Sequence, residues 1–144
     1  MSALFGHCHC GAIQASLEPG QPLDELPFRA CQCGFCRRHG AMTTSHPRSR
    51  LELVAAPGSV RRYRFGRRAV DAILCAECGV YVASLLSDGE ALLATVNVAG
   101  LALPGFGGRA PDIAVYDEES DAERLARRRA RWTPATIVEA SPSA

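Results

Sequence analysis

The stretch Cys31-Gln32-Cys33-Gly34-Phe35-Cys36 determines how the rest of this sequence is interpreted, because it carries three thiols within six residues. Two further pairs lie far from it along the chain, Cys8-His9-Cys10 and Cys75-Ala76-Glu77-Cys78, and together these clusters hold all seven cysteines. Disulfides alone would leave one of seven cysteines unpaired. Spacings this short let several thiolates converge on one ion, so metal binding is the leading hypothesis.

Zinc prefers four ligands in a closed structural site, and three protein ligands with one open position in a catalytic site. Seven cysteines divide naturally in this way. The pairs Cys8/Cys10 and Cys75/Cys78 can meet to form a four-thiolate site. Cys31, Cys33 and Cys36 can then bind a second ion whose fourth position is water, a substrate thiol or a nearby side chain. The opposite division, which takes one pair from the middle cluster, leaves one cysteine without a role.

The cysteines could also serve in two different ways. They could be buried structural thiols without metal, or one zinc site could accompany a cysteine redox centre. His39 lies three residues after Cys36 and could close the second site as a fourth ligand. His9 is expected to face solvent between two ligands, and no motif surrounds His7 or His46.

Length and composition set the broad class. A chain of 144 residues with 47% hydrophobic and 22% charged residues is expected to form one globular domain. A formal net charge of +1 argues against strong attraction to nucleic acid or to acidic membranes. The sequence has no apolar run of about 18 residues and no signal-peptide pattern at its start, so a cytoplasmic location is expected.

Alternating apolar and polar residues predict a mainly β fold with one helix near the C-terminus. The predicted strands span residues 12–18, 51–54, 60–65, 70–74, 80–86, 92–98 and 113–116, with a hairpin turn at 87–90. Glycine and proline predict a loop over 100–111. Ser120 and Glu123 form a capping box that starts the helix, and Pro134 bounds it. We expect a single domain over 1–134 and a flexible tail over 135–144.

The cysteine motifs also carry a family resemblance. The segments 6–13, 31–40 and 75–79, followed by Val96-Asn97-Val98, resemble the glutathione-dependent formaldehyde-activating enzyme (GFA) family over residues 6–101. The resemblance implies a zinc-stapled β fold related to methionine sulfoxide reductase B, with two zinc ions per chain. It implies a structural zinc on Cys8, Cys10, Cys75 and Cys78, and a catalytic zinc on Cys31, Cys33 and Cys36. The chain departs from the usual family pattern at Val80, at Leu101-Ala102 and over 65–74, which bears on the substrate rather than on the zinc ligands.

The resemblance further implies a carbon–sulfur lyase-type reaction in which a small-molecule thiol such as glutathione adds to formaldehyde, giving S-hydroxymethylglutathione. Arg29, Arg37 and Arg38 flank the middle cluster and can offset the charge of its thiolates. Arginine recognises carboxylates well, so Arg38 and Arg109 are the candidates for binding those of glutathione.

Two further substrate-side features are expected. Asn97 can hydrogen-bond either the substrate or the backbone. The loop 100–111 can either cover the second zinc, with Phe106 and Arg109 exposed on it, or serve only as a connection.

The arginine-rich helix suggests an alternative function. Its acidic start and basic end complement the helix dipole, and Glu123 and Arg127 are spaced as an ion pair, so nucleic acid binding is not expected. The alternative is a non-catalytic zinc-stapled module that binds a partner through an arginine-rich surface. A thiol–disulfide or sulfoxide redox protein is a third hypothesis.

Overall fold

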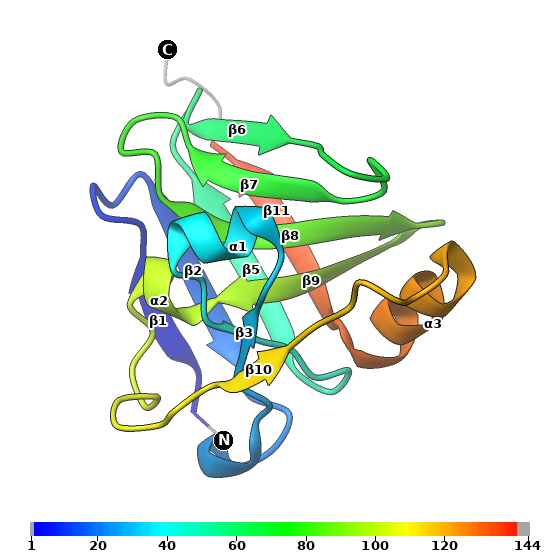
Figure 1. Ribbon diagram of the computed structural model, residues 1–144. Helices are drawn as coiled ribbons and strands as arrows, with labels where there is room; N and C mark the ends of the chain where they lie inside the picture. The colour runs from blue at the N-terminus through cyan, green and yellow to red at the C-terminus, as the bar shows by residue number, and fades with distance from the viewer. Residues whose placement is uncertain (1, 141–144) are drawn as a thin grey trace.

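The computed structural model describes residues 2–140, and the predicted mainly β fold is confirmed (Figure 1). Its strands are β1 (Leu4–His7), β2 (Ile13–Glu18), β3 (Arg29–Cys31), β4 (Thr43–Thr44), β5 (Arg50–Ala55), β6 (Val60–Tyr63), β7 (Asp71–Cys75), β8 (Tyr81–Asp88), β9 (Ala91–Asn97), β10 (Asp112–Ala114) and β11 (Thr133–Glu139). The helices are α1 (Gly34–His39), α2 (Val98–Leu101) and α3 (Asp121–Arg131), with a 3-10 turn at Leu23–Glu25. Among these helices none has the length and apolar character that a membrane crossing requires.

The strands form two groups joined by β11. One group runs β1-β2-β5, and β5 pairs in parallel with β11. The first residues of β11 pair antiparallel with β9, from which one branch leads through β8 and β7 to β6 and another through β4 and β3 to β10. Figure 1 shows β11 running between the two groups.

One buried cluster lies between these groups. Along β5 exposed and buried residues alternate strictly, so Leu51 and Leu53 point inward. They belong to the same core as Ile13 from β2, Val82 from β8 and Val96 from β9. The strand period of two therefore explains which residues of β5 are buried.

The predicted strands correspond to β2, β5, β6, β7, β8, β9 and β10, with ends that differ by at most two residues. The helix α3 begins at the predicted capping box: the Ser120 side chain accepts from Glu123 N, and the Glu123 side chain accepts from Ser120 N. Glu123 is thereby used in the cap, and Arg127 pairs with Glu119 instead of with Glu123.

In the C-terminal third one expectation is wrong, and one of the two alternatives for the loop over 100–111 is not supported. Residues 135–139 belong to β11 and pair with β5, so they are not a flexible tail; residues 141–144 lie outside the described part of the chain. The helix α3 is consequently followed by a strand and is not the last element. The loop after β9 begins with a short helix, α2, and buries Phe106, which is only 4% exposed, so Phe106 does not lie exposed on a lid.

Candidate functional site

The two cysteine pairs at 8/10 and 75/78 meet in space as the sequence predicted. Their four sulfurs lie within 4.8 Å of one another. The Cys10 sulfur is 3.8 Å from that of Cys8 and 3.6 Å from that of Cys75. Sulfurs at the corners of a tetrahedron around zinc would be about 3.8 Å apart, given a zinc–sulfur bond of about 2.3 Å. The four-cysteine cluster, as we call it, therefore suits a closed metal site.

Glycines make the tight turns that bring these sulfurs together. Gly11 and Gly79 have φ values of 85° and 80°, a region that costs other residues energy. Gly11 N donates to Cys8 O, and Gly79 N donates to Cys75 O. Each pair thus folds back on itself, and the cluster connects the β1–β2 loop to the β7–β8 turn.

The three-cysteine cluster, comprising Cys31, Cys33 and Cys36, is assembled by the junction between β3 and α1. Cys31 ends β3, and Cys33 is the N-cap residue of α1, with its sulfur accepting from Cys36 N at 3.4 Å. The three sulfurs lie within 4.8 Å of one another. Hydrogen bonds from Cys31 and Cys33, together with burial, hold the pKa of Cys36 far above its usual range, while the Cys33 pKa is well below its own. Three crowded thiols of this kind can all ionise only beside a cation, and soft thiolates suit zinc.

His39 does not complete this cluster. The only His, Cys, Asp or Glu side chains that the described residues bring together there are the three cysteines. The His39 ring instead packs on Phe35 at 4.5 Å and on Tyr81 at 5.6 Å between centroids. The histidine-closed alternative is therefore not supported. His9 is exposed, as expected of a residue between two ligands.

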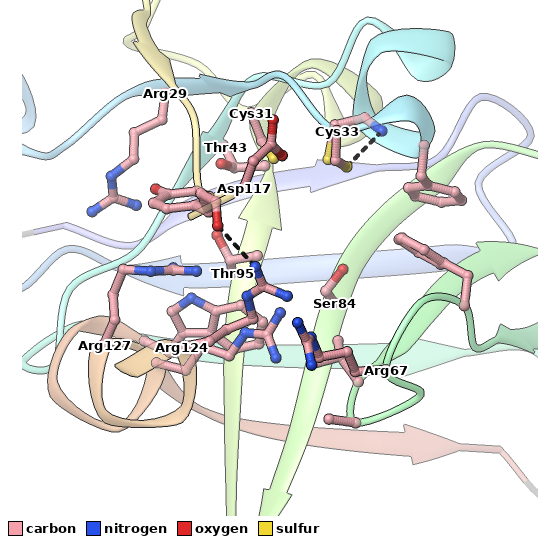
Figure 2. A pocket seen from close by; sticks show the side chains of 18 of the residues that line it. Arg29, Cys31, Cys33, Thr43, Arg67, Ser84, Thr95, Asp117, Arg124 and Arg127 are labelled. Carbon is pink, nitrogen blue, oxygen red and sulfur yellow. Dashed lines mark hydrogen bonds between the residues drawn. The ribbon is translucent and has the colours of Figure 1, made fainter. Parts of the chain in front are cut away.

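A cavity of about 250 Å³ opens beside the three-cysteine cluster (Figure 2). All three cysteines line it, next to the aromatic rings of Phe35 and Phe65. Figure 2 shows Cys31 and Cys33 at one side of the cavity and Arg67, Arg124 and Arg127 at the other. Six arginines line it in total, namely Arg29, Arg67, Arg68, Arg124, Arg127 and Arg128. Since Asp117 is the only carboxylate that the described residues contribute to the lining, the cavity favours an anionic ligand.

Ser84 supplies a hydroxyl between the cysteines and the arginines (Figure 2). Its Oγ lies 2.5 Å from the hydroxyl of Tyr81. Tyr81 is 2% exposed, and burial raises its pKa well above the usual range, so the phenol keeps its proton. The cavity therefore contains a fixed hydroxyl pair that can donate a hydrogen bond to an oxygen of a ligand.

The other sequence candidates for substrate binding lie elsewhere. Arg38 donates to Gly34 O and, with Arg37, lines a separate surface hollow on α1. The guanidinium of Arg109 donates to two backbone carbonyls, Leu23 O and Leu26 O, so it holds its own loop in place. Asn97 is 2% exposed and is satisfied by the backbone, accepting from Met42 N and donating to Tyr81 O. None of the three lines the cavity.

Sequence reasoning missed the arginines of α3. Arg124, Arg127 and Arg128 follow the i, i+3, i+4 spacing of one helix face, which is the spacing of a buried stripe. The sequence prediction assigns them to the helix dipole and to a basic surface, yet all three line the cavity. Their spacing is the signal that could have identified them.

Comparisons with known proteins agree with this site. A family model described as "Glutathione-dependent formaldehyde-activating enzyme" matches residues 3–119. A Rhodobacter sphaeroides protein, whose crystal structure was determined as a structural-genomics target, is 29% identical with a TM-score of 0.58, and the match covers 76% of this chain and 99% of that one. No curated protein matches the chain. Because the family model covers most of the chain, including every cysteine of both clusters, this chain belongs to the glutathione-dependent formaldehyde-activating enzyme family.

Proposed function

We propose that this chain is a zinc-dependent carbon–sulfur lyase-type enzyme that adds a thiol such as glutathione to formaldehyde, forming S-hydroxymethylglutathione. The observation that carries the proposal is the placement of the three-cysteine cluster in the lining of an arginine-rich cavity. A closed structural cluster has no need of such a cavity, whereas a site with a vacant position needs one. None of the cysteines of the four-cysteine cluster lines this cavity, and that cluster suits the structural role.

Two zinc ions per chain are part of this proposal. Cys8, Cys10, Cys75 and Cys78 would hold the structural ion, and Cys31, Cys33 and Cys36 would hold the catalytic one. The chemistry that zinc supplies when bound is to keep a substrate thiol ionised near neutral pH.

The residues of the chain account for the rest of the reaction. The substrate thiolate adds to the carbonyl carbon of formaldehyde, a carbon–sulfur bond forms, and the electron pair of the carbonyl moves to oxygen, which takes up a proton. The Ser84 hydroxyl, held by Tyr81, can hydrogen-bond that oxygen as its charge develops. Phe35 and Phe65 present apolar rings to the cavity on which the carbon chain of a ligand can pack. The arginines opposite offset the negative charge of the bound thiol.

We further propose a cytoplasmic location, because thiolate ligands and glutathione both require a reducing compartment. The alternative of a partner-binding module needs the α3 arginines on the surface. Since three of them line the cavity, the module is the weaker hypothesis.

The test is a pair of cysteine variants, one in each cluster. Elemental analysis of the wild-type chain, purified without chelator, should give about two zinc ions. Cys33→Ser should stay folded, retain about one zinc and lose glutathione-dependent consumption of formaldehyde, since its site closes only a local loop. Cys75→Ser, the matched change in the other cluster, should fail to fold, because structural zinc contributes roughly 10–16 kcal/mol in small domains. One zinc in the wild type with three titratable thiols, or an active Cys33→Ser, would refute the proposal.

A further inference from the structure

Part of the side of the cavity opposite the cysteines comes from α3, which starts at Asp121, just after the part of the chain matched by the family model. We call Arg124, Arg127 and Arg128 the arginine wall. Two of its members already have anionic partners. Nε and Nη2 of Arg127 donate to the carboxylate of Glu119, at 2.7 and 3.0 Å, and Arg124 donates to the same carboxylate at 3.4 Å.

Arg128 has no such partner. Its Nε is buried and makes no hydrogen bond to any described residue. The guanidinium carbon lies 5.2 Å from the ring centroid of Trp132, which also lines the cavity. A buried donor without an acceptor costs about 1–3 kcal/mol. Because Arg128 also lines the cavity, a ligand held there is placed to offer acceptors to this guanidinium.

The charges indicate what that ligand carries. Burial, followed by the nearby charges of Arg127 and Arg124, lowers the pKa of Arg128 to about 10, so at neutral pH a third cation stands beside two others. Glu119 offsets only part of this charge. A carboxylate has two coplanar oxygens, which match the fork of a guanidinium, and it would supply both the missing acceptor and the missing charge.

We propose that Arg128 binds a carboxylate of the thiol substrate and that α3 thereby selects acidic thiols over neutral ones. That the ligand is a thiol rests on the proposed function; that it carries a carboxylate rests only on the geometry of Arg128. The inference therefore predicts binding even of a ligand whose sulfur cannot ionise.

Trp132 provides the measurement, because it is the only tryptophan in the chain and packs against Arg128. The protein is titrated with S-methylglutathione, which keeps both carboxylates but has a blocked sulfur. Binding is followed by the change in Trp132 fluorescence, with calorimetry as a second measurement. Arg128→Gln should raise Kd about 10-fold or more, in line with hydrogen bonds to charged groups. The Kd of Arg128→Lys should lie between those of the wild type and of Arg128→Gln, since lysine keeps the charge but loses the two parallel hydrogen bonds of the guanidinium.

Arg129→Gln is the matched control. Arg129 is the next residue of the same helix, yet it pairs with Asp88 and does not line the cavity. Its substitution removes the same charge and should leave Kd unchanged. An equal loss in both variants would mean that only overall charge matters and would overturn the inference. The inference would also be overturned if S-methylglutathione did not bind the wild type. It would be overturned too if the diethyl ester of S-methylglutathione bound as tightly as the free diacid.

These outcomes separate the inference from the proposed function. If the wild type forms no adduct from glutathione and formaldehyde but binds S-methylglutathione through Arg128, the proposed function fails and the inference stands. If the wild type forms the adduct and Arg128→Gln leaves KM and Kd unchanged, the inference fails and the proposed function stands.

Discussion

Arg128 shows at the scale of one residue how a site can work against the stability of its fold. Its guanidinium is half-buried beside two other cations, with a buried Nε that has no partner in the described chain. Such a group lowers the stability of the unliganded protein and improves the binding of an anion. Neighbouring Arg127 is the opposite case, since Glu119 satisfies it.

This contrast predicts different effects on stability for two adjacent substitutions. Arg128→Met keeps the contact with Trp132 and removes the unsatisfied donor, so the free energy of unfolding should stay the same or rise by about 1 kcal/mol. Arg127→Met breaks two charged hydrogen bonds and leaves Glu119 with only the longer one from Arg124, so it should lower that free energy by about 1–3 kcal/mol. Urea denaturation measures both. Equal destabilisation by the two variants would contradict the assignment of Arg128 as an unsatisfied residue.

The cysteines were the most predictable residues of the site. Short turns impose the geometry within each pair and within the three-cysteine cluster, and the ligand count of zinc predicted that the two distant pairs meet. The substrate-side candidates could not be predicted in this way. Arg109 and Asn97 look available in the sequence, but the backbone groups that occupy them include ones from segments more than 50 residues away.

At the scale of elements, Glu119 holds α3 against the cavity. It precedes the helix and accepts from Arg124 and Arg127, while Arg127 also lies 3.6 Å over the ring of Tyr116. These contacts fix the segment between β10 and α3 to one face of α3. The orientation of the arginine wall toward the cavity therefore depends on the Glu119 carboxylate.

The carboxylate also makes α3 sensitive to acid. Hydrogen bonds from Arg127 and Arg124 hold the pKa of Glu119 below the ordinary value of 4.5. A group whose pKa is lowered by folding stabilises the protein above its unfolded pKa, and that contribution disappears as the pH falls through the folded pKa. Glu119→Gln should therefore cost about 1 kcal/mol at pH 7 and much less near pH 3. Thermal melts across this range measure the difference, and Glu118→Gln, at an exposed neighbour, should show none.

Strands with clear alternation and a capped helix were predictable from sequence, whereas several other elements were not. The helix α1 has only six residues, too few for an apolar period to appear. The strands β1 and β3 are four and three residues long. Residues 135–139 follow a proline and pair in parallel with β5, a partner about 80 positions earlier, so no local signal distinguishes them from a tail.

At the scale of the whole molecule, β11 connects the two groups of strands, and its start adjoins the site. Trp132 lines the cavity, and Thr133, which follows it, is fully buried, with its hydroxyl donating to His46 O and accepting from His46 N. The four-cysteine cluster connects the same two groups at another place, between the β1–β2 loop and the β7–β8 turn. The cavity thus depends on connections made far from it along the chain.

Two neighbouring residues of β11 test whether the strand stabilises the whole molecule. Ile137 packs against the core between the strand groups, whereas Val138 points outward and is 54% exposed. Ile137→Ala should lower the free energy of unfolding by about 2–3 kcal/mol, while Val138→Ala should change it by less than about 0.5 kcal/mol. If β11 joins both groups into one cooperative unit, the circular dichroism and Trp132 fluorescence transitions of Ile137→Ala should move down together. A Trp132 fluorescence transition that stays at the wild-type midpoint would show that the strands around the cavity unfold independently of β11. Equal losses of unfolding free energy in the two variants would show that the inward face of β11 adds nothing to the core.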